Sequence, residues 1–454
     1  MKNKAAGGMP DTEEEDVSKR RNFAYGLLIF ASFFLYVVLT GAKNLYTAEK
    51  TTLYSLGAFG NLTDLAVTME YYFYTYAVAQ VLLIFVIKKI NIKWYLGITL
   101  GLSALITVLM AFTGHIREHY ILYTVNGFLQ AGIWGCSIKV LGTYLPARLL
   151  PLSNQLMASG PAVAGALSYG GAAAFGEQWR IPFAVFGILL FFALVIYFFA
   201  VTYVSRFPKE VHTHSVVSED GTVKEVSDEA DNDFIHLKNR KRIVWFYVFS
   251  VIGGIALTAT YFAVHNNLDM FLKEVGGFSN DVSKWLTVSA PLMAALGPIL
   301  VVRACERHKN FITVCAVCFS LALAVMGAVL LFFEANAILA LALIVLYLVI
   351  VNGGRSISLS VAALRMRERI DVGVYTTLIN AGASIVAGWA PKLITTILDR
   401  EDLGIAESWK SSFRVVFLWN LAIVVFLALM IVAVKLLNRR DRKREARIRA
   451  RYSS

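Results

Sequence analysis

Residues Glu177–Val185 read EQWRIPFAV, and residues Glu407–Val415 read ESWKSSFRV. The two segments share the pattern E-x-W-[R/K]-x-x-F-x-V and lie 230 residues apart, about half of the 454-residue chain. Each segment leads into a long apolar run, so we interpret it as an outer-surface anchor in which an interfacial tryptophan lies beside a cation. The matching positions predict two parallel repeats related by an axis along the membrane normal.

The composition is typical of a membrane protein. Hydrophobic residues make up 57% of the chain and charged residues only 16%, whereas soluble proteins carry roughly 25% charged residues. Apolar runs of the length that crosses a bilayer, about 20 residues, recur from end to end. We therefore exclude an ordinary soluble enzyme and expect an all-α integral membrane protein with twelve transmembrane helices. The expected spans are 22–44, 66–87, 94–114, 120–143, 152–175, 181–204, 243–265, 283–302, 311–333, 337–360, 373–397 and 412–436.

A polar segment divides these spans into two six-helix bundles. The expected parts are an N-terminal tail at 1–21, a bundle at 22–204, a linker loop at 205–242, a second bundle at 243–436 and a basic tail at 437–454. Within the loop, Ser215–Asp233 is acidic and has no apolar periodicity, which predicts a solvated, disordered connector. Six spans, a loop and six spans form the organisation of a duplicated transporter.

The distribution of cations indicates the orientation. The chain has 43 Lys and Arg residues against 31 Asp and Glu, a net charge of +12, and 30 of the cations lie in segments on the side of the two termini. Because cytoplasmic loops carry an excess of Lys and Arg, we expect a multi-pass protein of the cell membrane with both termini in the cytoplasm. Lipid headgroups then account for the basic excess, and we expect no nucleic-acid partner.

The sequence predicts neither a metal site nor a cofactor. Cys315 and Cys318 have the spacing of some metal ligands, but both lie inside the apolar run Phe311–Phe333. We interpret them as small side chains of a membrane helix. No span carries clustered His, Asp or Ser at catalytic spacing, and no ATP-binding motif is present. We therefore expect neither an enzyme nor an ATP-driven pump.

The first helix of each half is expected to extend beyond its apolar boundary. No Gly or Pro interrupts Ala42–Leu56 or Ala256–Val275, and a Gly follows each run. Because Gly commonly follows the end of a helix, these runs place Lys43 and His265 inside helices rather than at their tips.

Four short motifs follow one another along nearly the whole chain. They are Gly41–Leu45 (GAKNL), Gln130–Trp134 (QAGIW) with Lys139, Leu272–Ser279 (LKEVGGFS) and Ser283–Trp285 (SKW). The ordered set resembles the organophosphate:phosphate antiporter family, a branch of the major facilitator superfamily.

The resemblance implies a major facilitator fold, with two six-helix bundles around a central cavity and alternating access to its two sides. It also implies exchange of a phosphorylated organic anion for inorganic phosphate, with Lys43, Gln130 and Lys139 in the substrate site. At further basic positions of the family this chain has, by our alignment, Gln80 in the second span and Tyr261 in the seventh.

Ionisable residues inside spans are candidates for function, because each costs about 2.5–3.5 kcal/mol on insertion scales. Lys139 and Arg355 lie in equivalent spans of the two halves. We expect both cations to face the central site and attract an anion; the alternative is that each extends to the cytoplasmic headgroups. Asn352–Gly354, just before Arg355, favours a groove where a side chain or ligand approaches the backbone.

Three further residues are weighed in the same way. Lys43 is the third candidate cation, and its alternative is a structural salt bridge with Glu70 at the outer end of the second span. His265 is a candidate to bind phosphate or to carry a proton, and its alternative is a hydrogen bond to backbone or to Asn266. Glu70 is a candidate for proton coupling or an interface anchor.

The sequence favours a secondary active transporter of a small organic anion. Lys43, Lys139 and Arg355 would capture the anion, and the bundles would close alternately around it. The first alternative is a proton-coupled importer of a sugar or other neutral solute, in which Glu70 and His265 matter more than the cations. An alternative from another class is a transport-dead membrane sensor or scaffold. We expect a monomer in the lipid bilayer.

Overall fold

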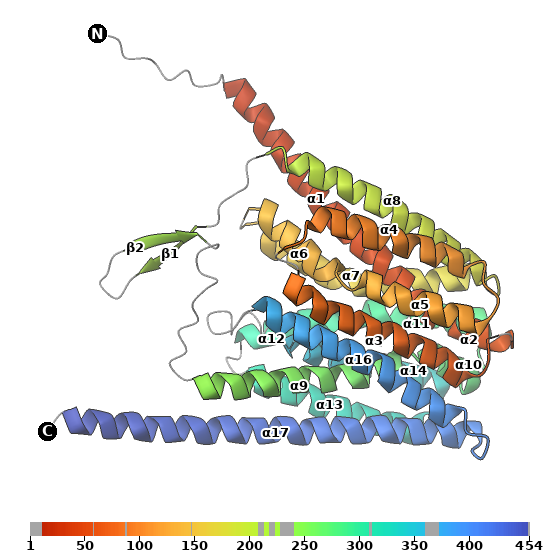
Figure 1. Ribbon diagram of the computed structural model, residues 1–454. Helices are drawn as coiled ribbons and strands as arrows, with labels where there is room; N and C mark the ends of the chain where they lie inside the picture. The colour runs from red at the N-terminus through yellow and green to blue at the C-terminus, as the bar shows by residue number, and fades with distance from the viewer. Residues whose placement is uncertain are drawn as a thin grey trace, which may run out of the picture.

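Each expected span corresponds to one helix or to two consecutive helices (Figure 1). The computed structural model describes residues 11–57, 59–86, 89–146, 148–207, 213–217, 223–227, 240–307, 311–358 and 372–452. The first half contains α1 (Asp11–Ala48), α3 (Leu62–Val86), α4 (Ile92–Met110), α5 (Ile116–Gln130) followed by α6 (Ile133–Tyr144), α7 (Leu150–Phe175) and α8 (Arg180–Val204). The second half contains α9 (Arg240–His265), α11 (Asn280–Ala294) followed by α12 (Leu296–Arg307), α13 (Phe311–Phe332), α14 (Ala337–Ser356), α16 (Val372–Leu398) and α17 (Ile405–Tyr452).

The helices form two bundles, α1 to α8 and α9 to α17, that meet along two pairs of helices. In the first bundle α1 packs against α7 and α8, and in the second α13 packs against α14 and α17. Between the bundles, α3 packs on α16 and α7 packs on α11. The start of α1 and the end of α17 lie at one end of the bundles, which we call the terminal end. The opposite end, near α2 (Lys50–Ser55) and α10 (Leu268–Glu274), is the distal end (Figure 1).

Both the inside and the outside of the bundles are apolar. Leu35 and Leu190 are fully buried in the first bundle, as Phe319 and Tyr347 are in the second. Large apolar side chains also lie exposed on outward faces, and Leu429 of α17 is 63% exposed. Within the described residues, nine candidate spans have the length and hydropathy needed to cross a membrane. Apolar outward faces on such helices fit a hydrocarbon surround rather than water.

The two glycines before Arg355 serve helix packing. A Cβ on Gly353 would lie 2.9 Å from the carbonyl oxygen of Gly297 in α12, and a Cβ on Gly354 would lie 2.5 Å from the ring of Phe319 in α13. The neighbouring helices can therefore come this close only because these two residues have no side chain. The groove expected beside Arg355 is filled by a side chain, because the Phe319 ring lies against the backbone of Gly354.

The repeated tryptophans are buried, so their interpretation as interfacial anchors is wrong. Trp179 and Trp409 are 5% and 2% exposed. Each packs on the phenylalanine four residues later, with ring centroids 6.0 Å apart for Trp179 and Phe183 and 5.7 Å apart for Trp409 and Phe413. The Nε1–H of Trp409 also donates to Glu274 at 2.8 Å. The shared pattern therefore gives the two halves an equivalent aromatic contact inside the protein.

The first helix of each half continues beyond its apolar boundary but is broken before its end. Lys43 lies inside α1, as expected, and α2 follows after a break at Glu49. In the second half His265 is the last residue of α9, and α10 follows after Asn266 and Asn267. The expectation that His265 lies well inside a helix is therefore wrong. Each break frees backbone groups that need partners from elsewhere.

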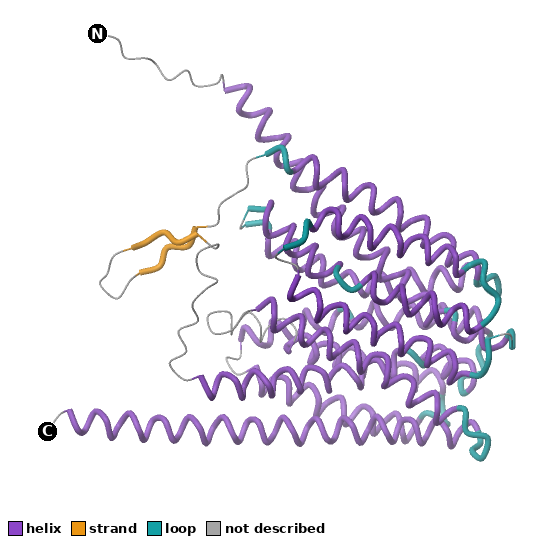
Figure 2. The backbone as a smooth tube through the Cα atoms, in the orientation of Figure 1, coloured by secondary structure: helices purple, strands orange, loops and turns teal. Residues whose placement is uncertain are grey.

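The linker loop contains a two-stranded hairpin, shown as strands apart from the helices in Figure 2. Strand β1 (Thr213–Val217) pairs antiparallel with β2 (Val223–Ser227). The expected disordered connector is therefore wrong for these two segments; the rest of 218–233 lies outside the described residues. Valine and threonine favour strands, and both strands contain valine. The prediction of disorder rested on the acidic composition and did not use this local preference. At the other end of the chain, α17 continues through the expected basic tail to Tyr452.

Candidate functional site between the two bundles

Two of the candidate cations come together between the bundles. Lys43 lies on α1 of the first bundle, and Arg355 lies in the last turn of α14 of the second. Both side chains are only partly exposed. They are close enough for each charge to act on the other, and the interaction is repulsive because both are cations. We call Lys43 and Arg355 the central pair.

Aromatic rings surround the central pair. The Lys43 Nζ atom lies 5.4 Å from the ring centroid of Phe73 and 5.6 Å from that of Tyr76, both on α3. The Arg355 guanidinium carbon lies 4.8 Å from the ring of Tyr261 and 5.5 Å from that of Phe262, both on α9. Such contacts contribute about 0.5–2 kcal/mol each, depending on how far the cation is desolvated.

The rings also link the two halves across the interface. Phe73 and Phe262 touch edge to face, with centroids 6.2 Å apart. Tyr36 of α1 lies near Arg355, within reach of its charge, and packs on Trp134 of α6 at 5.3 Å. The central pair is therefore enclosed by aromatic side chains from both bundles.

The central pair lacks a carboxylate among the described residues. No Asp or Glu in this part of the chain forms an ion pair with Lys43 or Arg355, and the buried Nε of Arg355 has no hydrogen-bond acceptor there. A cation held inside a bundle without a counter-charge carries a desolvation cost that an anion can relieve. The arrangement can therefore bind an anionic group.

His265 lies beside the central pair. Its ring stacks on Tyr261 with centroids 5.3 Å apart, and it meets Tyr169 of α7, in the other bundle, edge to face at 6.0 Å. The ring is 8% exposed, and its Nδ1 atom has no partner among the described residues. The expected hydrogen bond to backbone or to Asn266 is therefore not seen for this nitrogen, which can still donate to or accept from a ligand.

Three other sequence candidates lie away from the pair or are occupied. Gln130 is fully buried in the first bundle, where it accepts from the Tyr72 hydroxyl at 2.6 Å and donates to Ser103 at 2.9 Å. Gln80 lies one helical turn after Tyr76, is 5% exposed, and has a carbonyl oxygen without a partner in the described part of the chain. Lys139 is exposed on α6, toward the terminal end.

Glu70 does not pair with Lys43, so that alternative is wrong. The Glu70 carboxylate instead accepts from Lys392 of α16 at 2.6 Å and from the Tyr74 hydroxyl at 2.5 Å. Glu70 belongs to the first bundle and Lys392 to the second. The ion pair therefore joins the bundles, on the distal side of the central pair.

A second ion pair between the bundles is fully buried. The Nζ atom of Lys284 in α11 lies 2.8 Å from Glu49 at the end of α1, and both side chains are 0% exposed. Lys284 also donates to the backbone oxygens of Ala172 and Gly176, at 3.3 and 3.4 Å. Removing one partner of such a pair strands the other charge in a low dielectric, which costs about 3–5 kcal/mol.

The two helix breaks meet at this level. Lys50, the first residue of α2, donates to the backbone oxygen of Asn266 at 2.9 Å and to the side-chain oxygen of Asn267 at 2.7 Å. Asp269 of α10 accepts from Thr51 of the other bundle at 2.5 Å. Lys50 thus supplies a cation and hydrogen-bond donors to Asn266 and Asn267, the two residues between α9 and α10. We call Glu49, Lys50, Asp269 and Lys284 the distal network.

Sequence reasoning missed the distal network, although a signal was present. The expected span boundaries left Glu49 and Lys50 outside the first helix and treated Lys284 only as part of a motif. The uninterrupted run Ala42–Leu56 already placed these charges on a continuing helix. A charge on a helix that extends past its apolar stretch requires a buried partner or water, and here the partner lies on the other bundle.

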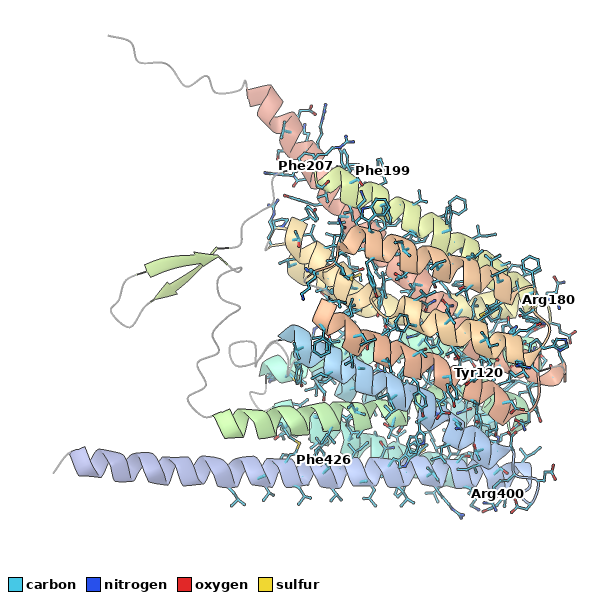
Figure 3. All side chains as sticks on the ribbon, in the orientation of Figure 1. Tyr120, Arg180, Phe199, Phe207, Arg400 and Phe426 are labelled. Atoms are coloured by element: carbon cyan, nitrogen blue, oxygen red, sulfur yellow. The ribbon has the colours of Figure 1, made fainter. Side chains whose placement is uncertain are left out.

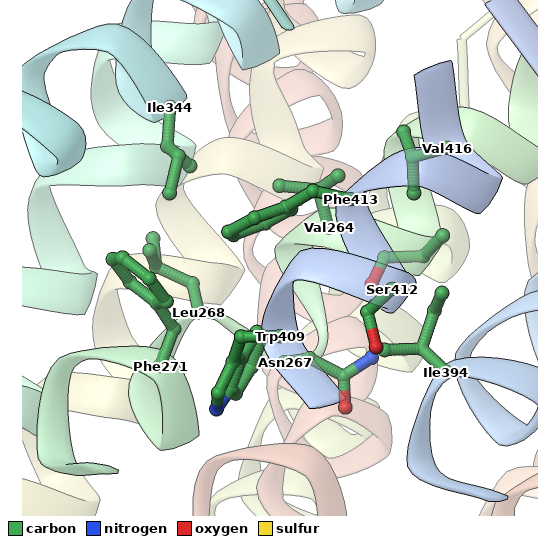
Figure 4. A pocket seen from close by; sticks show the side chains of 11 residues that line it. Val264, Asn267, Leu268, Phe271, Ile344, Ile394, Trp409, Ser412, Phe413 and Val416 are labelled. Carbon is green, nitrogen blue, oxygen red and sulfur yellow. Dashed lines mark hydrogen bonds between the residues drawn. The ribbon is translucent and has the colours of Figure 1, made fainter. Parts of the chain in front are cut away.

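A cavity inside the second bundle is too small for an organic anion. This cavity, between α9, α10 and α17 (Figure 4), is lined by apolar residues such as Phe271 and Phe413 and holds about 10 Å³. That is room for about one water molecule. In the described part of the chain no three His, Cys, Asp or Glu side chains come together in a metal-binding group.

The chain is similar to one protein family over most of its length. The model of the family described as Major Facilitator Superfamily matches residues 22–391. No curated protein matches the chain.

Solved structures share the arrangement of helices. A bacterial homolog of the human lysosomal transporter Spinster has 12% identity and a TM-score of 0.66, over 88% of this chain and 95% of that one. The D-xylose-proton symporter has 13% identity and a TM-score of 0.66, over 88% and 96%. The nucleoside transporter NupG has 13% identity and a TM-score of 0.62, over 90% and 99%. These likenesses concern the fold, and the expected all-α membrane fold is confirmed.

Proposed function

Because the chain belongs to the major facilitator superfamily, we propose on that premise that it carries a small organic anion across the membrane. Membership makes the protein a multi-pass membrane protein and a secondary transporter of a small molecule rather than an enzyme. The choice of an anion rests on one observation, the central pair of cations that has no carboxylate among the described residues.

An anionic group between Lys43 and Arg355 would remove their mutual repulsion. Each hydrogen bond to a charged group contributes about 1.5–3 kcal/mol, and a guanidinium can bind a carboxylate or phosphate through two parallel bonds. Because one cation belongs to each bundle, a bound anion would hold the two halves together at the centre. His265 beside Arg355 could add a further donor.

The distal network supports a mechanism of alternating access. Its ion pair and hydrogen bonds join the bundles at the distal end, so the anion would reach the central pair from the terminal end in this conformation. Opening the distal end would separate Glu49 from Lys284 and Glu70 from Lys392, and contacts at the terminal end would have to replace them. The bound anion would neutralise Lys43 and Arg355, which would lie close together whether the distal end or the terminal end is closed.

We propose further that transport is an exchange, with an organophosphate moving against inorganic phosphate. An empty site would bring two repelling cations together whenever the bundles reorient, which hinders return of the empty carrier. A doubly charged phosphate group matches two cations better than a single charge does. The resemblance of the Lys43 motif to the organophosphate:phosphate antiporters supports the same choice.

The orientation and the oligomeric state belong to this proposal. The terminal end would face the cytoplasm, as the excess of Lys and Arg on that side indicates, and one chain would form a complete carrier. A proton-coupled importer of a neutral solute is the alternative. It is less well supported, because Glu70 is engaged by Lys392 and Tyr74 and a neutral solute would leave the central pair without a counter-charge.

Transport by the purified full chain in liposomes tests the proposal. Liposomes loaded with inorganic phosphate should take up radiolabelled phosphate, and phosphate esters added outside should inhibit that uptake. Arg355→Gln and Lys43→Gln should each reduce the exchange at least tenfold. Arg303→Gln, which removes an exposed cation of α12 at the terminal end, is the matched control and should stay within twofold.

Two outcomes separate the levels of the proposal. If carboxylates but not phosphate are exchanged, and Arg355→Gln abolishes that exchange, transport of an organic anion is supported and organophosphate exchange is wrong. If no anion is exchanged and a pH gradient drives entry of a neutral solute, the organic anion itself is wrong.

A further inference from the structure

A groove on the outside of the first bundle lies between α4 and α8, which pack along one another. It holds about 370 Å³. Its lining residues are Trp94, Gly97 and Ile98 of α4 and Leu194, Val195 and Phe198 of α8. Trp94, Ile98 and Val195 are 66%, 60% and 52% exposed. On the outward face of membrane-crossing helices such a surface meets lipid rather than water.

The base of the groove follows from helical spacing. Gly97 and Gly101 are four residues apart, so they lie on one face of α4, and that face packs on α8. A Cβ on Gly97 would lie 2.6 Å from the ring of Phe198. The absent side chain therefore lets that ring lie against the helix, and Val195 and Ile98 form the sides of an apolar channel.

A cation closes the groove at the terminal end. Lys93 precedes Gly97 by four residues and so lies on the same face of α4. Its Nζ atom donates to the Thr202 hydroxyl at 2.8 Å and lies 5.6 Å from the Phe198 ring, and both groups belong to α8. In the described part of the chain no carboxylate pairs with Lys93. Trp94 beside it has the residue type that anchors helices at the level of lipid headgroups.

We propose that this groove binds one anionic phospholipid. An acyl chain lies along Gly97, Val195 and Phe198, and the phosphate contacts the ammonium group of Lys93. The Thr202 hydroxyl accepts from Lys93 and donates to the backbone oxygen of Phe198, so it orients the ammonium group. The chemistry is complementary at both ends. The apolar channel suits the acyl chain, and a cation without a carboxylate partner among the described residues suits the headgroup. The proposal gives Lys93 a ligand, in addition to its place among the cations that indicate orientation.

Native mass spectrometry of the purified full chain in detergent tests this site. Phosphatidylglycerol and phosphatidylcholine with identical acyl chains are added in equal amounts, and retained lipid is counted. One lysine near an anionic headgroup contributes about 1 kcal/mol, so we expect about a fivefold preference for phosphatidylglycerol. Lys93→Gln should abolish the preference, and Val195→Trp, which fills the exposed channel, should lower retention of both lipids. Arg303→Gln, an exposed cation on the other bundle, is the control that should keep the preference.

Three results would overturn the site. These are equal retention of the two lipids by the unaltered chain, an unchanged preference in Lys93→Gln, and spectra in which Val195→Trp converts a dimer to a monomer. The last result would assign the groove to a second copy of the chain.

Discussion

Charges lie between the bundles in two regions that differ in how they are neutralised. In the distal network every cation has an acceptor on the other bundle, as when Lys284 contacts Glu49 at 2.8 Å. In the central pair, Lys43 and Arg355 rest on aromatic rings and have no carboxylate among the described residues. Paired charges hold a conformation, whereas cations left without a counter-charge are available to a ligand.

The comparison explains why a carrier can use both arrangements. An ion pair buried between the bundles favours one closed state, and its two charges must be solvated separately when that end opens. Aromatic faces stabilise a cation only by about 0.5–2 kcal/mol, so they keep it dehydrated without competing strongly with an anion. The same interface therefore contains the distal network, which favours a closed state, and the central pair, which is available to bind an anion.

The largest expected effect concerns the buried ion pair. Glu49→Gln leaves Lys284 buried without its counter-charge, which destabilises the closed distal end by about 3–5 kcal/mol. Labelling of a Val288→Cys reporter by a membrane-impermeant maleimide, in a background without the four native cysteines, should accelerate about a hundredfold or more. Val288 packs on Ala48 and Tyr169 of the other bundle, so it reports separation there.

A second substitution distinguishes loss of the pair from general damage. Glu49→Gln combined with Lys284→Met removes both charges and should recover more than half of the lost protection. If the double variant labels as fast as Glu49→Gln alone, the ion pair is not what holds the distal end closed.

The next effect concerns the central pair. Arg355→Gln should weaken binding of an anionic ligand about tenfold to a hundredfold, since a hydrogen bond to a charged group contributes about 1.5–3 kcal/mol. Arg355→Lys keeps the charge but loses the planar guanidinium, so its affinity should lie between those of the unaltered chain and Arg355→Gln. A thermal-shift titration with inorganic phosphate and phosphate esters measures the change, and equal shifts in all three proteins would remove Arg355 from the site.

A smaller effect concerns the rings. Phe262→Leu should lower the melting temperature more in the unaltered chain than in an Arg355→Gln background, because only the former loses a cation–ring contact. The coupling between the two substitutions should be about 1 kcal/mol. Identical decreases in the two backgrounds would mean that Phe262 acts by packing alone.

The smallest effect is expected at an exposed ion pair at the distal end, where Figure 3 labels Arg400. Arg400 donates to Asp402 at 2.6 and 3.0 Å in the loop after α16. The guanidinium holds the pKa of Asp402 below its usual value, so any contribution would persist at neutral pH and be lost only as the pH falls through that lowered pKa. Water screens this pair, and Asp402→Asn should leave the melting temperature unchanged between pH 5 and 8. A clear decrease in melting temperature would show that this exposed pair stabilises the protein as a buried pair does.

The sequence predicted the fold well because membrane helices are constrained locally. Backbone groups in hydrocarbon must be satisfied within the segment, so an apolar run of sufficient length becomes a helix whatever surrounds it. The expected spans therefore correspond to helices, and the two halves were recognised from the Trp179 and Trp409 patterns. The meaning of those patterns was wrong, since burial of a tryptophan depends on which helices lie beside it.

Three of the six substrate-binding residues predicted from the sequence lie together in the structure, whereas Lys139, Gln130 and Gln80 do not join them. Lys43, Arg355 and His265 were named from the sequence, and the structure places them close together. The partners were not predictable, because Glu70 is separated from Lys392 by 322 residues and Lys284 from Glu49 by 235. Nothing local distinguishes Lys139, which lies exposed on α6, from Arg355, which lies on the rings of α9.

The sequence by itself determined that this chain crosses the membrane in two halves, and it named Lys43 and Arg355 as charges that need an explanation. Apolar length and cation content can be assigned to single segments, and the bilayer acts on each segment separately. The repeat needs only a comparison of two stretches of sequence. Only the tertiary structure decided which charges are neutralised and which are left for a ligand. Coulomb interactions and desolvation depend on distance and surroundings, and for residues hundreds of positions apart these are set by how the two bundles pack.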